Sequence, residues 1–344
     1  MISTSLPDWA HALANPPAGQ FKQSPEQFVV IEQLGFEPEQ RGDHLWCWIE
    51  KEGVETLRAI SLCAREFGVR ERDVGYSGLK DRMALTRQWL SFPLSEQPTQ
   101  QSLERLADQG VKVLKAVPHP RKLKRGSHRT NRFEIAIEFD ARDAEQVFER
   151  WQHVQQTGVP NYFGAQRFGH AGLNVERARS LLAKGWHKRA DRHGMLLSSA
   201  RSYLFNLTLA ERVSSGSWYT PLEGEIVNLD GSASFFSGAD ASMDELIARA
   251  ADQDIHPTAP LWGKGVLEST AQARDVELHS VKQEQDMIAG LERAGVAMAR
   301  RALRLRLIEP VWQRTEQGAL LGFGLMRGGY ATAVLRELIA APGL

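Results

Sequence analysis

The segment from Gly75 to Trp89, GYSGLKDRMALTRQW, combines residue types that could do chemistry, because the acid Asp81 stands between Lys80 and Arg82. Glycines precede the acid and strand-favouring residues follow it, which predicts a tight loop leading into a strand. Neighbouring cations favour the charged form of a carboxylate, and a positioned carboxylate can act as nucleophile or general base. A solvated turn with a surface ion pair fits the same residues, so both interpretations stay open.

Two basic tracts are candidates for binding a polyanion. Residues 119–132 carry six Lys or Arg, two His and no acid, and a second tract contains Arg300, Arg301, Arg304 and Arg306. The whole chain balances 42 Lys and Arg against 42 Asp and Glu, so only the distribution of charge is informative. Phosphate contacts dominate nucleic-acid affinity, so the tracts indicate RNA or DNA binding, with solvated basic loops as the alternative.

The composition excludes several classes of protein. At 344 residues, 42% of them hydrophobic, the chain has the length of about two globular domains. No apolar run approaches a membrane span, and the first residues lack the basic start and apolar core of a signal peptide. Cys47 and Cys63 cannot build a disulfide framework or a Cys-rich zinc site, which is typical of the cytoplasm, and we expect a cytoplasmic protein.

Motifs for cofactor and metal chemistry fail at identifiable positions. Gly322-x-Gly324 nearly matches a dinucleotide fingerprint, but its third glycine comes one place late. GYSGL nearly matches a serine-hydrolase elbow, but it ends on Leu79 where that motif needs glycine. No phosphate-binding GxxxxGK[ST] loop occurs, the His residues are scattered, and no clustered acids suggest a two-metal site. We therefore predict no cofactor and no metal.

Hydrophobic periodicity predicts the elements that position the Asp81 loop. Strands are expected at 28–32, 44–50, 86–92, 111–117 and 131–140, and helices at 54–67, 102–109 and 141–156. In the last of these strands Phe133, Ile135, Ile137 and Phe139 fall on one face. This mixture of strands and helices predicts an α+β domain.

The chain changes character near residue 158 and again near residue 300. The middle part is predicted to be helical at 197–212, 241–253 and 267–294, and irregular at 218–237. Strands return at 303–307 and 319–326, before a closing helix at 330–340. Strict alternation of Leu and Arg in 303–307 predicts a half-buried strand with its arginines on one face. We expect one discontinuous domain, 1–158 and 300–344, with an insertion at 159–299.

Four stretches, in order along nearly the whole chain, resemble motifs of the TruD family of pseudouridine synthases. The family signature G-x-K-D-x-x-A-x-T-x-Q is matched by Gly78, Lys80, Asp81, Ala84, Thr86 and Gln88. VPNYFGAQRFG at 159–169 is similar to the family's Asn-Tyr-Phe-Gly-x-Gln-Arg-Phe-Gly stretch. Residues 28–32, with Lys22 and Pro25 before them, resemble its N-terminal segment, and residues 329–338 resemble its C-terminal one.

The resemblance implies a fold and an activity. The fold would be a pseudouridine-synthase catalytic domain with a mixed, mainly antiparallel sheet, plus an inserted, helix-rich α/β TRUD domain. The reaction would isomerise uridine-13 in the D arm of tRNA to pseudouridine without a cofactor. Such a uridine must be flipped out of the folded RNA to reach a carboxylate. We expect a monomer that needs no protein partner.

The resemblance also implies roles for individual residues. Asp81 would be the catalytic carboxylate, attacking the sugar, adding to the base or removing the C2′ proton; the residues do not decide among these steps. Lys80 would contact a phosphate or hold Asp81 ionised. Phe133 would stack on the uracil, with core packing as the alternative, and Asn131 on the same strand face would hydrogen-bond the base or the loop.

The remaining site residues are expected to bind RNA or to organise the domains. Lys22 would contact a phosphate, and Tyr330 could stack on the base, although relatives often carry Phe at that position. The proposed contacts to the RNA backbone are Arg121, Lys122, Lys124, Arg125, Arg304 and Arg306. Asn161, Gln166 and Arg167 of the second motif fit a hinge between domains as well as chemistry.

Two other functions compete with this one. A non-catalytic RNA-binding protein of the same fold would bind RNA without Asp81 and modify no base. A hydrolase using Asp81 as nucleophile would need a second acid or a metal site nearby, and the sequence shows neither.

Overall fold

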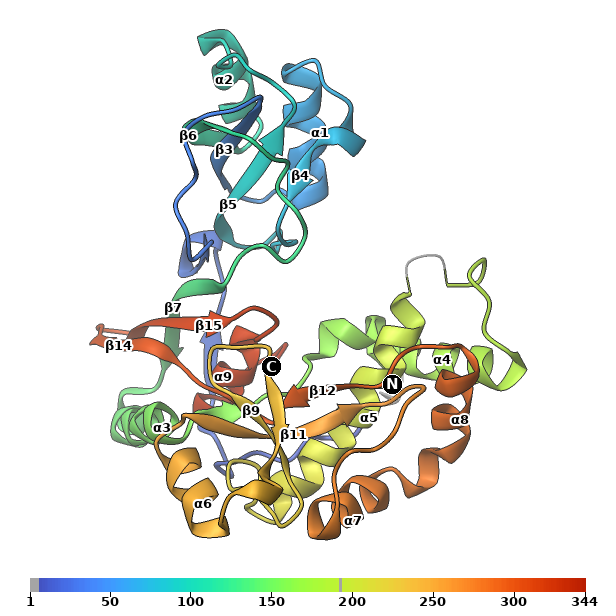
Figure 1. The fold of residues 1–344 in the computed structure, drawn as a ribbon. Coiled ribbons are helices and arrows are strands. Elements are labelled where there is room, and N and C mark those ends of the chain that lie inside the picture. The colour runs from blue at the N-terminus through green and yellow to red at the C-terminus, as the bar shows by residue number, and fades with distance from the viewer. Residues whose placement is uncertain (1–5, 192–193) are drawn as a thin grey trace. The chain divides into compact units, whose positions relative to one another are not determined.

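The computed structural model describes residues 6–191 and 194–344, which form two compact units (Figure 1). Unit 1 comprises Met1–Pro17, Glu145–Arg306 and Gly329–Leu344. Unit 2 comprises Ala18–Ala144 and Leu307–Gly328.

Unit 2 is built on one mixed sheet with the strand order β14-β15-β7-β2-β5-β3-β6, to which β1 adds beside β7 and β4 beside β5. Its strands are β1 Gly19–Phe21, β2 Phe28–Gln33, β3 His44–Lys51, β4 Gly75–Tyr76, β5 Leu85–Phe92, β6 Val111–His119, β7 Thr130–Phe139, β14 Ile308–Arg314 and β15 Gly318–Met326. Neighbours along this order are antiparallel except β2 and β5, which are parallel. The sheet is therefore mainly antiparallel, as predicted.

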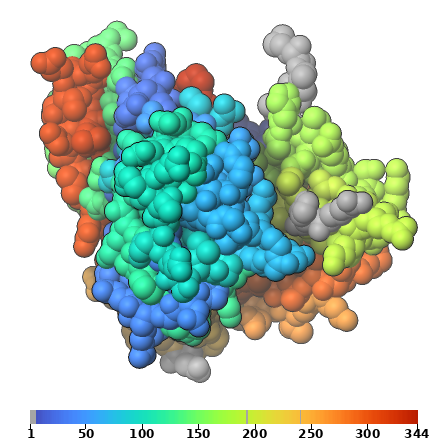
Figure 2. Space-filling model, turned by 90° about the horizontal axis from the view of Figure 1, so that it is seen from above, coloured from blue at the N-terminus to red at the C-terminus, as the bar shows by residue number. Residues whose placement is uncertain are grey.

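Two helices of unit 2 bury the apolar face of β3 and β5. They are α1 Thr56–Glu66 and α2 Gln100–Ala107, and Figure 2 shows the surface of this region in blue and teal. The Thr99 side chain caps α2 by accepting a hydrogen bond from the Ser102 amide. The core beneath contains Leu45, Cys47, Ile49, Ile60, Cys63, Leu90, Phe92 and Leu106. The alternation expected for β7 is present, since Phe133, Ile135 and Ile137 are buried and Glu134 is exposed.

Unit 1 packs helices around α5 and a small second sheet (Figure 1). Its helices are α3 Ala144–Thr157, α4 Leu173–Lys184, α5 Met195–Ser214, α6 Met243–Ala251, α7 Ala271–Ser280, α8 Gln285–Arg293 and α9 Ala331–Leu338. Its sheet has the order β10-β9-β11-β12, made of β9 Ile226–Leu229, β10 Phe235–Ser237, β11 Ile255–Leu261 and β12 Ala299–Ala302. A two-strand pair joins β8 Val159–Pro160 to β13 Arg304–Leu305.

Three predictions for the second half of the chain are wrong in detail. The helix expected at 267–294 is two helices, α7 and α8, separated by the 3₁₀ turn Lys282–Glu284. The segment 218–237, expected to be irregular, contains β9 and β10. The half-buried strand expected at 303–307 is reduced to Arg304–Leu305, and both of those residues are buried.

The compact units divide the chain at other positions than the predicted domain boundaries. Unit 1 contains α3 and the C-terminal helix α9 together with the middle of the chain. The contacts of Arg150 in α3 explain this grouping. Its guanidinium donates to the carbonyl oxygens of Leu13 (2.7 Å), Ala14 (3.1 Å) and Glu337 (2.8 Å). One buried side chain thus ties three separate chain segments together. The division into 1–158 with 300–344 and an insertion at 159–299 stays a prediction.

Candidate active site on the Asp81 loop

The loop that carries Asp81 connects β4 to β5 and is held from beneath by buried polar side chains. The Gln88 amide nitrogen donates to the Gly78 carbonyl at 3.1 Å, and Gln88 is fully buried. The Thr56 hydroxyl of α1 accepts from the Lys80 amide at 2.8 Å and donates to the Gln88 side-chain oxygen at 3.0 Å. Buried polar groups with satisfied hydrogen bonds fix a backbone in one conformation, so the loop is a rigid support.

Gly75 lets the chain after residue 120 pack directly against the start of this loop. A Cβ atom at Gly75 would lie 2.3 Å from the Ser91 hydroxyl and 2.4 Å from the Leu123 carbonyl. No side chain fits at such distances, so the glycine is required by close backbone approach.

The Asp81 side chain projects from the loop and is 43% exposed. Its Oδ2 atom forms an ion pair with the Lys22 ammonium at 2.9 Å. Lys22 has a φ of 59°, in the left-handed region, and its ammonium lies 4.5 Å from the centre of the Phe28 ring. A backbone held in this rarely occupied region indicates that the surrounding structure determines where Lys22 points. Lys22, predicted as a phosphate contact, is here the partner of the carboxylate.

Lys51 supports the same loop from inside the unit. It is the last residue of β3, is 1% exposed, and donates from its ammonium to the Asp81 carbonyl at 2.8 Å. Burial lowers the pKa of Lys51 to about 8, although the charge of Asp81 acts in the opposite direction. The ammonium therefore stays charged at neutral pH and loses its proton close to the physiological range.

Lys80 is directed into the protein and away from solvent. Its side chain is 5% exposed, and its ammonium lies 3.2 Å from a carboxylate oxygen of the fully buried Glu32 and 2.5 Å from the Asn131 side-chain oxygen. Burial lowers the pKa of Lys80 and raises that of Glu32, while each partner's charge opposes the shift. The expectation that Lys80 contacts a phosphate or pairs with Asp81 does not fit this geometry, since Lys22 has that second role.

Asn131 and Phe133 lie on the same face of β7, as predicted, but in different surroundings. Asn131 is half-buried and connects Lys80 to His128, whose Nε2 lies 3.4 Å from the Asn131 amide nitrogen. His128 Nδ1 in turn lies 2.5 Å from the Ser77 hydroxyl of the Asp81 loop, and burial lowers the pKa of His128 to about 4. Asn131 thus belongs to a neutral-histidine network that reaches the loop.

Phe133 is packed as a core residue. It is 6% exposed, its ring stacks on Phe323 at a centroid distance of 5.5 Å, and it meets Phe28 edge-on at 6.3 Å. This packing matches the alternative stated for Phe133, and its contact with a uracil stays a prediction.

Tyr330 and the second motif belong to unit 1. The Tyr330 hydroxyl accepts a hydrogen bond from Arg167 at 2.8 Å. Asn161 donates to the Ala302 carbonyl at 2.8 Å, which joins the start of the motif to β12. Gln166 is exposed. Asn161 and Arg167 are thus engaged in contacts that organise unit 1, which favours their structural interpretation over a chemical one.

The two basic tracts differ in their exposure to solvent. Arg121, Lys122, Lys124 and Arg125 are all exposed around the buried anchor Leu123, as a phosphate surface requires.

Arg304, predicted as a phosphate contact, is 2% exposed and unavailable to solvent. Its guanidinium donates to His256 Nδ1 at 2.8 Å and to the carbonyl oxygens of Ala250 and Ile255, each at 2.7 Å. Burial lowers the pKa of Arg304 to about 10. The prediction for Arg304 is wrong because this guanidinium satisfies buried acceptors of unit 1. Arg306 is 45% exposed and pairs with Asp230 at 2.6 Å.

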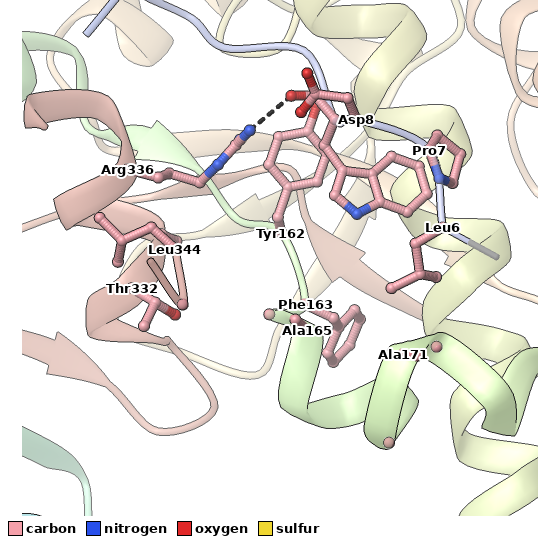
Figure 3. Close-up of a pocket in the computed structure, with 16 residues that line it drawn as sticks. Leu6, Pro7, Asp8, Tyr162, Phe163, Ala165, Ala171, Thr332, Arg336 and Leu344 are labelled. Atoms are coloured by element: carbon pink, nitrogen blue, oxygen red, sulfur yellow. Dashed lines mark hydrogen bonds between the residues drawn. The ribbon is translucent and has the colours of Figure 1, made fainter. Parts of the chain in front are cut away.

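Unit 1 also contains a cavity of about 470 Å³ that the sequence did not indicate (Figure 3). The N-terminal arm (residues 6–17), the second motif (residues 159–169) and α9 contribute its walls, including Trp9, Tyr162, Phe163, Thr332 and Arg336. Arg336 donates to the Trp9 carbonyl at 2.6 Å and lies 4.9 Å from the centre of the Tyr162 ring. Arg336 therefore fastens the arm to the motif.

Among the described residues, no three His, Cys, Asp or Glu side chains are grouped so that they could hold a metal ion. No helix in the described ranges is long and apolar enough to cross a membrane. Cys47 and Cys63 are both buried as free thiols. The chemistry available on the Asp81 loop is that of one exposed carboxylate with an ammonium partner.

Sequence analysis missed Glu32 and Lys51, although strand alternation contains a signal for both. Glu32 lies two residues after buried Val30 on the inward face of β2. Lys51 lies two residues after buried Ile49 on the inward face of β3. A charged residue at an inward position needs a buried partner. Neither sequence position indicates which partner it has.

Comparison with known proteins identifies the family. A family model described as tRNA pseudouridine synthase D (TruD) matches residues 12–193 and 192–338. The chain is 48% identical to tRNA pseudouridine synthase D of Chromohalobacter salexigens over 344 residues, covering 98% of each chain. It is 42% identical to the protein of the same name from Methylococcus capsulatus over 328 residues, covering 93% of this chain and 91% of that one.

A solved structure of a TruD protein from Methanosarcina mazei has the same fold. The TM-score is 0.75 at 19% identity, and the superposition covers 97% of this chain and 98% of that one. The predicted fold class is thereby confirmed. Because one family model and several relatives match nearly the full length, this chain belongs to the tRNA pseudouridine synthase D (TruD) family.

Proposed function

We propose that this chain, an isomerase of the pseudouridine synthase class, converts uridine-13 in the D arm of tRNA to pseudouridine with Asp81 as the catalytic carboxylate. The observation that carries the proposal is the presentation of Asp81. Its side chain is 43% exposed on a loop whose backbone is held by Thr56, Gln88 and Lys51. A rigid support for one reactive group is what catalysis by positioning needs.

The reaction breaks the bond between uracil N1 and ribose C1′, turns the base, and joins C5 to C1′. C5 loses one proton, N1 gains one, and no net electrons are transferred, so a single carboxylate with a suitable partner is sufficient chemistry. Lys22 binds Oδ2 of Asp81, and we assign the other oxygen, Oδ1, to the substrate. The carboxylate can then attack C1′, add to the base or remove the C2′ proton.

The groups around Asp81 are assigned supporting roles. Lys22 orients the carboxylate and, being 18% exposed at its side chain, is near enough to solvent to meet a phosphate as well. Lys80 is a positioning residue, because it acts through Glu32 and Asn131. Phe133 and Asn131 remain proposed contacts of the flipped base, and the stacking role of Tyr330 remains a separate prediction for unit 1.

The exposed cations Arg121, Lys122, Lys124 and Arg125 are proposed to follow the phosphates of the tRNA, with the half-exposed Arg306 as a further contact. Neutralised phosphates release counterions, so affinity falls steeply as salt concentration rises. We propose that the chain acts as a cytoplasmic monomer on tRNA alone, without a protein partner or cofactor.

The test uses tRNA transcripts that carry tritium at uridine C5, because formation of pseudouridine at a labelled uridine releases that tritium. We expect release in the presence of a chelator and without any added nucleotide. A transcript with cytidine at position 13 is the matched control and is expected to release only background tritium. Absence of release from the native transcript would contradict the activity, and equal release from the two transcripts would contradict the assigned position.

A further inference from the structure

A pocket of about 370 Å³ in unit 2 lies beside the exposed basic loop and apart from the Asp81 carboxylate, which does not line it. Three aromatic rings and three cations contribute to its lining, namely Phe36, Trp46, His119, Arg121, Lys122 and Lys124. Its volume falls within the range of about 300–1,000 Å³ that is usual for small-molecule sites. Aromatic rings combined with cations are the two components of sites that bind unpaired nucleotides.

The floor of this pocket is rigid. Trp46 and His119 stack with centroids 3.9 Å apart, and they are 3% and 4% exposed. The Trp46 indole donates to the Arg121 carbonyl at 2.7 Å, and the Arg121 amide donates to His119 Nδ1 at 3.1 Å. The floor therefore also fixes where the basic loop begins.

Phe36 forms an exposed wall above this floor. Its ring is 48% exposed and meets Trp46 edge-on at 6.3 Å. Gly42, with a φ of 113°, lets the Phe36 loop pack against Pro120, because a Cβ atom there would lie 2.4 Å from the Pro120 Cα. Phe36 thus contacts the buried Trp46 ring while much of its own ring surface stays open to solvent.

The cations stand at the rim. Leu123 is buried and its amide donates to the Ser91 hydroxyl at 2.8 Å, which anchors the middle of the loop. The Lys122 ammonium is held by the Arg72 carbonyl at 2.9 Å. Arg121 has a side chain that is 78% exposed and only a loose contact with Glu39, at 3.8 Å. Arg121 and Lys124 are therefore the cations best placed to meet a phosphate.

Two exposed carboxylates, Glu37 and Glu39, complete the lining. They disfavour a free phosphate or another small anion inside the pocket. A carboxylate accepts hydrogen bonds from the amino group of cytosine and from similar exocyclic amines. The lining thus matches a base with an amino group better than it matches uracil.

We propose that this pocket binds one unpaired nucleotide of the RNA, with an amino-bearing base against Phe36 and its phosphate on Arg121 and Lys124. This nucleotide is a different one from the target uridine, and the identity of the RNA rests on the proposed function. The pocket would fix the RNA at a second point, which makes it a binding subsite and leaves the chemistry to the Asp81 loop.

The first test measures equilibrium binding of tRNA to Phe36→Leu and Phe36→Tyr in an Asp81→Asn background, so that no turnover occurs. Leucine keeps an apolar side chain but removes the ring, and we expect the Kd to rise about tenfold. Tyrosine keeps the ring and is expected to bind within about twofold of the parent. Leu114→Ala is the matched control, because Leu114 is 49% exposed in the same unit and does not line the pocket.

Equal Kd values for Phe36→Leu and the parent would overturn the proposal, as would equal losses for the leucine and tyrosine variants. Melting temperatures of all variants show whether each one is folded. Tritium release is measured in parallel in the Asp81 form, where Phe36→Leu is expected to raise KM and to change kcat less than twofold. If the wild type released no tritium, the proposed activity would be contradicted. The Kd values would still show whether the pocket contributes to RNA binding.

The second test addresses the base. Short single-stranded RNAs of cytidine and of uridine are compared as competitors of tRNA binding to the wild-type chain. We expect the cytidine oligomer to compete at a several-fold lower concentration, and Glu37→Leu with Glu39→Leu, which remove both acceptors, to abolish that preference. Equal competition by the two oligomers would contradict the assigned base class.

Discussion

The two basic tracts of this chain look alike in sequence and differ completely in the folded protein. Residues 121–125 place four cations in solvent around one buried leucine. In the other tract, Arg304 satisfies buried acceptors of unit 1, Arg300 pairs with Glu277, and Arg306 pairs with Asp230. The cations of the first tract are exposed and make few contacts within the protein, such as that of Lys122 with the Arg72 carbonyl, whereas most of the second tract is engaged in buried pairs.

The difference shows that availability of a charge depends on what surrounds the backbone. The first tract leaves the sheet after β6, its buried leucine donates its backbone amide to the Ser91 hydroxyl, and the flanking cations are exposed. The second runs through β12 and β13, where inward positions meet carbonyls and carboxylates of β11, α6 and α7. A buried guanidinium with several acceptors is a structural element, because leaving those acceptors unpaired is costly.

The largest effect that separates the tracts is expected for Arg304→Met. Methionine removes the donor that His256 Nδ1 and the Ile255 carbonyl share and one of the donors to the Ala250 carbonyl, so we expect the free energy of unfolding to fall by about 3 kcal/mol. Denaturant titration measures this loss. The matched control is Arg306→Gln, a partly exposed pair whose removal is expected to cost about 1 kcal/mol or less. A stable Arg304→Met protein with weakened RNA binding would reverse the assignment.

A smaller effect, on binding alone, is expected when the exposed tract is neutralised. Arg121→Gln combined with Lys124→Gln removes two phosphate contacts, so we expect about a tenfold weaker Kd for tRNA. The slope of log K against log salt concentration should become shallower by between about 1 and 2. Stability should stay within about 0.5 kcal/mol, since both side chains are exposed. An unchanged salt slope would show that this loop does not bind phosphate.

The smallest effect is expected from the titration of Lys51, which is buried, unlike the lysines of the exposed tract. Its pKa in the folded chain is about 8, below its ordinary value of 10.5, so the charge beneath the Asp81 loop is lost as pH rises through 8. We expect the rate of tritium release to decline above that pH. Between about pH 8 and 10.5 the unfolded chain binds the proton that the folded chain has released, so this group makes stability rise with pH.

Lys51→Arg provides the comparison for this limb, because arginine does not titrate in the same range. The melting temperature of the variant shows that it is folded. We expect its rate of tritium release to fall less above pH 8 than that of the wild type. Any titration of the RNA is common to both proteins. If the rate of tritium release fell equally above pH 8 in both proteins, the fall would be due to a group other than Lys51.

Much of unit 2 could be predicted because its strands are long and alternate cleanly. The strand expected at 131–140 is β7, Thr130–Phe139, and that expected at 44–50 is β3, His44–Lys51. The sheet of unit 1 was not predicted because three of its strands have only three or four residues, the longer β11 contains two prolines, and β11 and β12 pair across a long stretch of sequence. Local periodicity does not contain such long-range pairing.

The site divides in the same way. Asp81 was found because its motif is local, and the structure places its side chain on an exposed, well-supported loop. The sequence predicts that the adjacent Lys80 either contacts a phosphate or holds Asp81 ionised, whereas the ion pair in the structure is formed by Lys22, 59 positions away. Sequence neighbours in an extended loop point in different directions, so adjacency did not reveal which lysine forms the ion pair.

Catalysis by the Asp81 carboxylate is tested by single-turnover tritium release by Asp81→Asn with enzyme in excess over labelled tRNA. Asparagine keeps the shape of the side chain and removes its charge. Asp73→Asn is the matched control, because Asp73 is also a partly exposed, ion-paired acid of unit 2, with Arg70 at 2.6 Å. We predict background release by Asp81→Asn with tRNA still bound, and full release by Asp73→Asn. Release by Asp81→Asn at the wild-type rate would show that the Asp81 carboxylate is not catalytic.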